Sequence, residues 1–173
     1  MSSKNIVLAQ IGCGYWGPNL LRNFSALPEC TVKYVVDPSA ERRLFVESNF
    51  QFSCAIETHQ TVLEDPSVDA VVIATPAASH FSLAKDALDA GKHVFVEKPL
   101  ATRVAEVDEL SRRAAERNLV VMTGHTFVYN SAVRHVKRLI DAGELRYIYS
   151  QRLNPWAYPI RHRRSLELRA SRY

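Results

Sequence analysis

The feature that most constrains this chain is a G-x-G-x-x-G run at residues 12–17. It follows a short apolar segment and precedes a stretch with apolar residues at helical spacing. In that setting the first glycine allows a tight turn, the second lets the backbone approach a pyrophosphate, and the third lets the helix pack close to a strand. The N–H groups at the start of such a helix favour an anion. The pattern predicts a dinucleotide site, with an ordinary glycine turn as the alternative.

Asp37 supports that prediction, because it stands twenty residues past Gly17 at the end of a second β-rich run. A carboxylate there accepts hydrogen bonds from the adenosine ribose hydroxyls and repels a 2′-phosphate, which favours NAD over NADP. Arg42 and Arg43 leave an alternative open. An arginine near this point could receive the phosphate, or both could lie on a solvated helix face.

Strand-like and helical patterns alternate along residues 5–154. The strand-like runs are nearly continuous in Val, Ile and Leu, which is typical of a parallel sheet covered on both faces. The pattern predicts an α/β fold with a doubly wound parallel sheet. Strands are expected at 5–11, 31–36, 69–74, 93–97, 119–123 and 145–152. Helices are expected at 39–49, at 57–64 after a short apolar run at 52–56, and at 78–90, 102–117 and 130–141, in addition to the helix that follows the glycine run.

Polar residues follow three of the later strands, where ligands bind in open α/β sheets. A lysine at such a place, Lys98, could hydrogen-bond a substrate hydroxyl and stabilise developing alkoxide charge as hydride leaves the carbon. Taken alone, it could equally be a surface charge. The three groups are Thr75 and Pro76 with His80, then Glu97 with Lys98, then His125, for which a structural role is the alternative.

These segments resemble the Gfo/Idh/MocA oxidoreductases over residues 5–154. The resemblance rests on GCGYWGPNLLRNF, VVIATPAASHF, GKHVFVEKPLA and TGHTFVYNSAV, and the EKP triplet is its most specific part. It implies a Rossmann-type fold and NAD(P)-dependent oxidation of a sugar or polyol carbinol, or the reverse reduction. The first and last motifs are most similar to the branch that acts on nucleotide-linked amino sugars or related uronates.

The resemblance also implies roles for single positions. Lys98 matches the active-site lysine of the family. His125 and Asn130 match the segment that leads into the second domain, and His125 is a candidate substrate contact; Ser131 replaces a proline common there. No metal site is implied. The implied cofactor-binding positions are Gly12, Gly14, Tyr15, Trp16, Gly17, Asp37, Thr75, Pro76, His80, Glu97 and Lys98.

The family continues into an α+β domain that binds substrate, often aids oligomerisation and carries the histidine that acts as general acid/base. We expect a dinucleotide-binding domain at 1–124 and a linking helix with the first strand of a truncated substrate domain at 125–154. We expect a disordered, out-of-frame tail at 155–173. Back-translated with permitted codons and shifted by one deleted base, the tail reads LGPIRSGIDVLWNLGPHD, which resembles the family segment around that histidine.

Charge and composition limit the other function classes. The net charge is +4, but residues 155–173 hold five arginines and one glutamate, so residues 1–154 carry 17 basic and 17 acidic side chains. The basic balance therefore does not indicate nucleic-acid binding. Three cysteines are too few for a disulfide scaffold, and Cys13, with no cysteine near it, is expected to fill a tight loop.

No stretch approaches the roughly 18 apolar residues of a membrane span, and no signal peptide is evident at the N-terminus. A cytoplasmic chain with a small-molecule partner is expected, and its full-length relatives are expected to be homo-oligomers. Two further hypotheses remain open: a fragment that binds a dinucleotide without turnover, and a non-enzymatic Rossmann-type redox sensor.

Overall fold

The computed structural model describes residues 5–50, 53–143 and 149 of the 173-residue chain. The chain divides into two compact units, residues 1–129 and 130–173, which are described separately.

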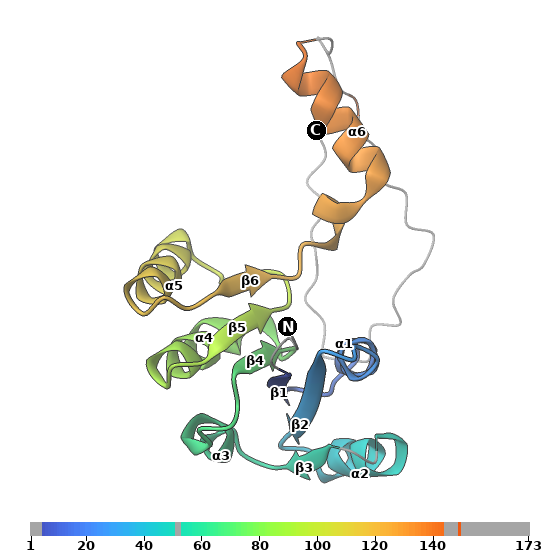
Figure 1. Cartoon of the computed structure of the whole chain (residues 1–173), viewed down its shortest axis with the longest axis vertical. Coiled ribbons are helices and arrows are strands. Elements are labelled where there is room, and N and C mark those ends of the chain that lie inside the picture. The colour runs from blue at the N-terminus through green and yellow to red at the C-terminus, as the bar shows by residue number, and fades with distance from the viewer. Residues whose placement is uncertain (1–4, 51–52, 144–148, 150–173) are drawn as a thin grey trace, which may run out of the picture. The chain divides into compact units, whose positions relative to one another are not determined.

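The first unit is built on one six-stranded sheet in which every strand pair is parallel (Figure 1). The strand order is β3-β2-β1-β4-β5-β6, so the chain runs outward from β1 to one edge and then from β4 to the other. This confirms the predicted α/β doubly wound parallel sheet. The strands are β1 (Ile6–Ile11), β2 (Cys30–Val36), β3 (Cys54–Ile56), β4 (Ala70–Ile73), β5 (His93–Val96) and β6 (Val121–Thr123).

Helices cover both faces of the sheet. Helices α1 and α2 lie on one side in Figure 1, and α3, α4 and α5 lie on the other. Two short 3-10 turns, η1 and η2, follow β4 and β6. The bounds are α1 (Gly17–Ser25), α2 (Ala40–Asn49), α3 (Gln60–Glu64), η1 (Ala77–Ser79), α4 (His80–Asp89), α5 (Val104–Glu116) and η2 (Thr126–Tyr129).

The two layers of helices produce two buried clusters, one on each face. Leu21 of α1 and Val46 of α2 belong to one cluster. Leu88 of α4 and Leu110 of α5 belong to the other, and all four side chains are fully buried. Truncating a leucine at such a position to alanine typically costs about 2–5 kcal/mol. Burial on both faces explains why the strands are apolar throughout instead of alternating.

Near the start of β4, a group of polar side chains is paired internally; we call it the Asp65 cluster. The Asp65 carboxylate accepts hydrogen bonds from Lys33 Nζ at 2.6 Å and Tyr34 Oη at 2.9 Å, and from the Ser67 N–H at 2.8 Å. Lys92 donates to the Asp65 carbonyl at 2.7 Å. The hydrogen bond from the Lys33 ammonium is the largest cause that lowers the pKa of the Asp65 carboxyl well below its usual range. The cluster ties β2 to the segment that leads into β4.

The second unit contains α6 (Ser131–Asp141), which confirms the helix expected at 130–141. Asn130 caps it by accepting from the N–H groups of Ala132 and Val133 at 2.9 and 3.3 Å. None of its residues is buried, including the apolar Val136 and Ile140. Apart from Tyr149, the strand expected at 145–152 lies outside the described residues, as does the tail at 155–173.

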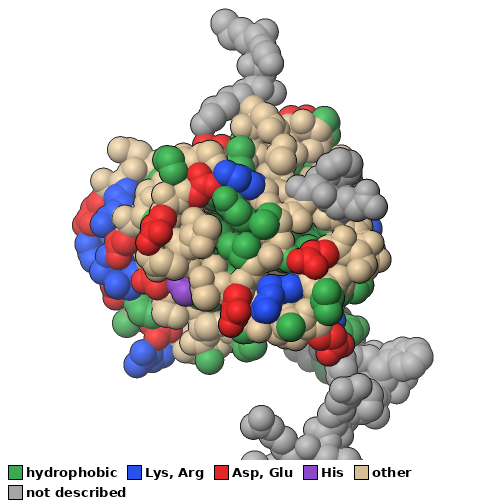
Figure 2. All heavy atoms as spheres, turned by 90° about the horizontal axis from the view of Figure 1, so that it is seen from below, with side chains coloured by type: hydrophobic (Ala, Val, Ile, Leu, Met, Phe, Trp, Pro, Cys, Tyr) green, Lys and Arg blue, Asp and Glu red, His purple; other side chains and the backbone are tan. Residues whose placement is uncertain are grey.

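Several predicted boundaries were wrong by one to three residues. The helix expected at 57–64 begins only at Gln60, the strand expected at 119–123 begins at Val121, and η1 precedes the helix expected at 78–90. No described helix is long and apolar enough to cross a membrane. Figure 2 shows acidic and basic side chains interspersed over the face that it draws, around a hydrophobic patch.

Candidate functional site

The glycine loop between β1 and α1 has the geometry that its sequence predicts. Gly12 has φ +94°, and a Cβ added there would lie 2.7 Å from the Ala74 carbonyl oxygen. A Cβ on Gly17 would lie 2.7 Å from the Gly12 carbonyl oxygen. A Cβ on Gly14 would meet no described atom within 4 Å. Packing therefore requires glycine at both ends of the loop, while Gly14 faces open space that a ligand can approach.

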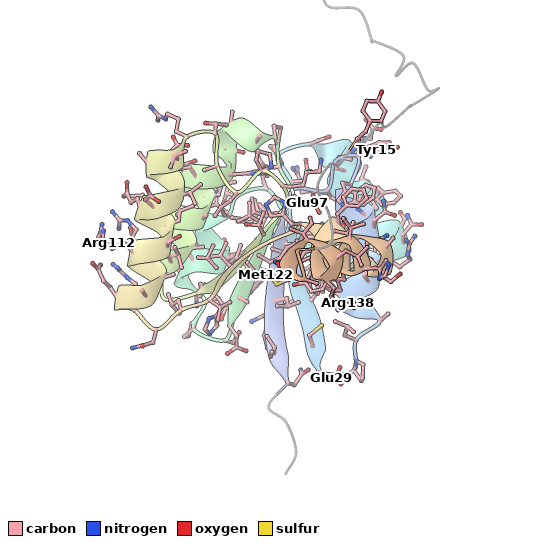
Figure 3. The ribbon with its side chains drawn as sticks, turned by 90° about the horizontal axis from the view of Figure 1, so that it is seen from above. Tyr15, Glu29, Glu97, Arg112, Met122 and Arg138 are labelled. Carbon is pink, nitrogen blue, oxygen red and sulfur yellow. The ribbon has the colours of Figure 1, made fainter. Side chains whose placement is uncertain are left out.

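The start of α1 can receive an anion. Its N-cap, Trp16, makes no side-chain cap hydrogen bond, Pro18 occupies the first turn, and no acidic residue lies in that turn. Tyr15 and Trp16 are exposed, and Figure 3 shows the Tyr15 side chain pointing away from the body of the protein. The partial positive charge of the helix terminus therefore meets no side chain of opposite sign within the first turn.

Asp37 anchors the glycine loop to the end of β2. Its side chain is 8% exposed. Oδ2 accepts from the Cys13 N–H at 2.8 Å, and Oδ1 accepts from the Ser39 N–H at 2.9 Å. A carboxylate has about four acceptor positions, so capacity remains for further donors. Burial, and to a lesser extent the Asp37 charge, raise the pKa of the Cys13 thiol, which keeps Cys13 a neutral filler of the loop.

The glycine loop and Asp37 open on a cavity of about 540 Å³, a size typical of small-molecule sites. Its walls come from the ends of β1, β2, β3 and β4. Two carboxylates, Asp37 and Glu57, contribute to the lining. The lining residues are Ile11, Gly12, Gly14, Val36, Asp37, Pro38, Glu57, Thr58, His59, Ala74, Thr75, Pro76, Ser79 and Leu83.

Arg43 is half-buried beside this cavity and does not lie on a solvated face. Its Nη1 donates to the carbonyl oxygens of Asp37 and Pro38 at 2.8 and 2.9 Å. Its Nη2 lies 3.7 Å from the Glu57 carboxylate. The guanidinium therefore stabilises the turn after β2 through these hydrogen bonds. Arg42 is exposed, as one of the two alternatives predicts.

The residues expected after β4 gather around one imidazole. Thr75 and Pro76 line the cavity, and Ser79 Oγ donates to Thr75 Oγ1 at 2.8 Å. His80 is 1% exposed. Its Nε2 lies 2.8 Å from the Thr75 carbonyl oxygen, and its Nδ1 lies 2.7 Å from that of Pro99. His80 is absent from the cavity lining, so its ring faces two backbone carbonyls instead.

The residues expected after β5 and β6 lie at the same edge of the sheet. Glu97 is half-buried, and a Cβ on Gly124 would lie 3.0 Å from its Oε1, so Glu97 packs against the loop after β6. Lys98 and His125 are exposed. In Figure 3, Glu97 lies toward the Tyr15 end of the sheet, and Glu29, which precedes β2, lies at the opposite end. The carboxyl ends of the strands thus bring together the nucleotide-side and chemistry-side candidates.

Comparison with known proteins identifies the chain. A family model described as "Oxidoreductase family, NAD-binding Rossmann fold" matches residues 6–125, more than half of the chain. The chain belongs to the Gfo/Idh/MocA family. The matched stretch includes the glycine loop, Asp37 and the Glu97-Lys98-Pro99 triplet.

Among curated proteins, this Gfo/Idh/MocA chain is 40% identical over 128 residues to dTDP-3,4-didehydro-2,6-dideoxy-alpha-D-glucose 3-reductase of Streptomyces violaceoruber. It is 33% identical over 138 residues to scyllo-inositol 2-dehydrogenase (NAD(+)) of Bacillus subtilis. These matches cover 73% and 79% of this chain but 36% and 40% of the relatives. The chain therefore spans about two fifths of the length of the curated relatives it matches.

Solved structures show the same partial coverage. Apo scyllo-inositol dehydrogenase from Lactobacillus casei matches with a TM-score of 0.75 at 23% identity, over 83% of this chain and 43% of that one. A mutant 3-ketoreductase from Actinomadura kijaniata, in complex with TDP-benzene and NADP, matches with a TM-score of 0.72 at 31% identity, over 81% and 45%. Both support the Rossmann assignment of the first unit.

One residue that supports the glycine loop, Gln10, was not predicted from the sequence. Gln10 is 1% exposed within β1, and its Nε2 donates to the carbonyl oxygens of Gly12 and Gly17 at 2.9 and 3.0 Å. Its Oε1 has no hydrogen-bond partner among the described residues. An amide inside an otherwise apolar buried strand was the available signal. Glu57, Thr58 and His59 were also missed, because they lie in a stretch that the sequence pattern assigned to a helix.

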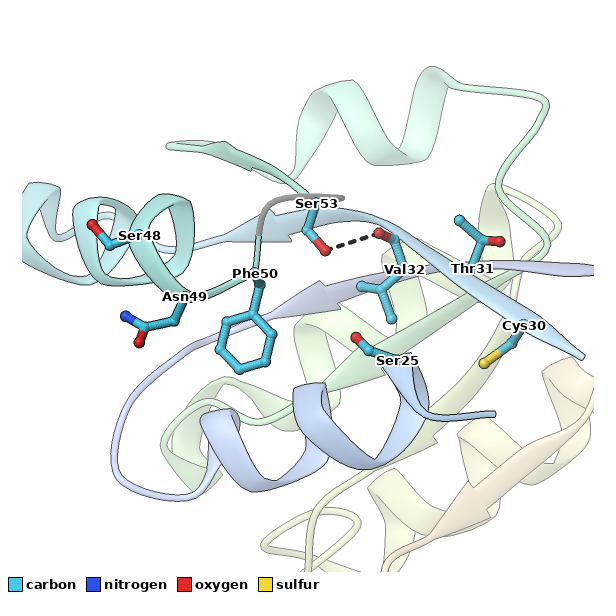
Figure 4. A pocket seen from close by; sticks show the side chains of 8 residues that line it. All are labelled: Ser25, Cys30, Thr31, Val32, Ser48, Asn49, Phe50 and Ser53. Atoms are coloured by element: carbon cyan, nitrogen blue, oxygen red, sulfur yellow. Dashed lines mark hydrogen bonds between the residues drawn. The ribbon is translucent and has the colours of Figure 1, made fainter. Parts of the chain in front are cut away.

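A second cavity of about 600 Å³ lies where β2 begins, between α1 and α2 (Figure 4). Among the residues that the structure describes, none that lines it is charged. Its polar groups bond to the protein itself: Ser53 Oγ donates to the Val32 carbonyl at 2.9 Å, and Asn49 Nδ2 to the Phe45 carbonyl at 2.7 Å. Burial raises the pKa of the Cys30 thiol in its wall, whose Sγ donates to a carbonyl at 2.8 Å. The cavity has room for a ligand but few polar groups that could orient one.

Proposed function

We propose that this chain is the nucleotide-binding part of an NAD(P)-dependent oxidoreductase. The reaction is hydride transfer between a nicotinamide and a CH–OH group of a sugar, sugar nucleotide or polyol. One observation carries the proposal: the glycine loop, the start of α1 and Asp37 surround one cavity at the carboxyl ends of the strands. That is where dinucleotides bind in open α/β sheets.

The residues present fit a dinucleotide. Open space at Gly14 and the uncapped start of α1 suit the diphosphate, and Asp37 suits the adenosine ribose hydroxyls. Tyr15, Trp16, Thr75 and Pro76 are assigned to the walls of this site. When bound, the cofactor supplies the nicotinamide that accepts or donates the hydride.

NAD is the favoured cofactor. Asp37 and Glu57 both line the cavity, and two carboxylates repel the 2′-phosphate of NADP. Arg43 is engaged by two carbonyl oxygens and by Glu57, which turns it away from the role of phosphate receptor. This preference is tested by comparing the affinity of the chain for NAD with its affinity for NADP.

Lys98 is assigned to the chemistry. It is exposed at the end of β5, beside the loops that carry Thr75 and His125. Its ammonium orients the substrate oxygen and stabilises negative charge that develops there. His125 is assigned to substrate contact, and Glu97 holds the start of this loop through its Oε2, which accepts from the Lys98 N–H at 3.2 Å.

Titration of the chain with NADH, followed by nicotinamide fluorescence, tests the proposal together with an assay of sugar-nucleotide and inositol oxidation. Saturable NADH binding supports the nucleotide site, and Ser53→Ala, at the cavity beside the start of β2, is a matched control that should leave the dissociation constant within about twofold. Binding without turnover means that the chain is the cofactor-binding part alone. Absence of binding contradicts the proposal.

The remaining assignments are proposals of the same kind. We infer that residues 1–124 form the dinucleotide domain, that 125–154 lead into a substrate domain, and that 155–173 are read out of frame. Sequencing the gene around codon 155 tests the last point, and a downstream reading frame unlike the family contradicts it. A cytoplasmic location and homo-oligomeric full-length relatives are part of the same proposal, with no role in binding nucleic acid or membrane.

A further inference from the structure

His80 occupies a position that the proposed chemistry does not use directly. It begins α4, is 1% exposed, and its ring lies between the loops that follow β4 and β5. The Nε2–O distance to Thr75 is 2.8 Å, and the Nδ1–O distance to Pro99 is 2.7 Å. Both lie at the short end of the range for N–H···O hydrogen bonds, and both partners are backbone carbonyls.

The two contacts join parts of the chain that follow different strands. Thr75 follows β4, and Pro99 follows β5. Both carbonyls belong to the backbone, so a ring held at hydrogen-bond distance from each limits how far the two loops can separate.

We propose that His80 is a positioning residue whose ring connects the loop of the cofactor cavity to the loop of Lys98. Thr75 belongs to the cavity wall, and Pro99 directly follows Lys98. The connection therefore sets the place of the Lys98 backbone relative to the bound nucleotide, while His80 itself touches neither nucleotide nor substrate. This consequence for the site rests on the proposed function, but the two contacts do not.

Two variants test the contacts without nucleotide or turnover, so that their failure and the failure of the proposed function are distinguishable. His80→Phe removes both ring nitrogens, and His80→Gln keeps a side chain that can hydrogen-bond. We expect His80→Gln to loosen the two loops less than His80→Phe does, and equal loosening by both variants overturns the proposal.

Hydrogen exchange followed by mass spectrometry tests this connection between the loops. His80→Phe is compared with His135→Phe, which changes an exposed histidine of α6. We expect His80→Phe to speed amide exchange about tenfold in residues 75–79 and 97–103 and less than about twofold in β1 and β2, because the ring's contact with one carbonyl in each loop is lost. NADH should bind more weakly to His80→Phe alone. Unchanged exchange, or equal loosening of the whole sheet, overturns the positional role.

Discussion

The two ends of the strands each border a cavity of similar volume. One, of about 540 Å³, lies at the carboxyl ends, and the other, of about 600 Å³, lies beside the start of β2. Their walls differ in chemistry. The first includes Asp37 and Glu57, with a glycine that faces open space. The described part of the second wall contains no charged residue, and its polar side chains largely donate to nearby carbonyls. We infer from this comparison that strand direction and polar groups with remaining hydrogen-bonding capacity indicate a binding site better than cavity volume does.

Gly12→Ala should have the largest effect. The added Cβ meets the Ala74 carbonyl at 2.7 Å and forces a non-glycine residue to φ +94°. We expect a loss of about 2–5 kcal/mol in the free energy of unfolding, from overpacking and from the positive φ, together with loss of NADH binding. Urea unfolding and fluorescence titration measure the two effects. A variant as stable as the parent contradicts the described loop geometry.

Asp37→Ala should weaken NAD binding about 10–100-fold, because hydrogen bonds to a charged acceptor are lost. NADP binding should fall less, since repulsion of the 2′-phosphate is relieved at the same time. Calorimetric titration with both dinucleotides measures the difference. Asp37→Asn is the matched control, because it keeps the size of the side chain and part of its capacity to accept from Cys13 and Ser39. Equal losses for NAD and NADP argue against a ribose contact.

Gly14→Ala separates binding from stability. Its Cβ enters open space, so the free energy of unfolding should change by less than about 1 kcal/mol, the usual cost of an exposed substitution. The same methyl group stands where the diphosphate would approach, so the NADH dissociation constant should rise about tenfold. Unimpaired binding would move the diphosphate away from the loop.

Ser53→Ala probes the cavity beside the start of β2. It removes the hydrogen bond to the Val32 carbonyl and should cost about 1 kcal/mol of stability. NADH binding should not change. A clear loss of NADH affinity would mean that the second cavity is coupled to NADH binding, which would contradict the distinction drawn between the two cavities.

Asp65→Asn should have the smallest effect and the clearest pH dependence. The folded pKa of Asp65 lies below its unfolded value of about 4, so its contribution to stability is complete above that pH and disappears as the pH falls through the folded value. The Tm difference between variant and parent should therefore be greatest near neutral pH and shrink below about pH 4. A constant difference across that range contradicts the ionic role. NADH binding at pH 7 serves as the control and should stay unchanged.

The sequence predicted the parallel sheet because nearly continuous Val and Ile runs have few other stable environments. It also placed Asp37 and Lys98 correctly at strand ends, since connection order alone assigns them to one edge. It could not predict that Arg43 bonds to the carbonyls of Asp37 and Pro38, or that Gln10 joins Gly12 to Gly17. Those contacts depend on side-chain geometry across the turn, which periodicity does not encode. Glu57 was missed for a different reason, because its stretch was assigned to a helix that begins only at Gln60.

The strand order has a consequence for how fast the chain folds. β1 pairs with β2 through partners such as Ile6 and Cys30, close along the chain, whereas β1 and β4 meet through Leu8 and Ala70. The central pair, β1 and β4, therefore joins the residues that are farthest apart along the chain. Forming this pair costs more chain entropy than forming any of the other four strand pairs. During synthesis, β1 and β2 can meet while β4 is still being made, so the cavity beside the glycine loop, which needs the end of β4, is completed late.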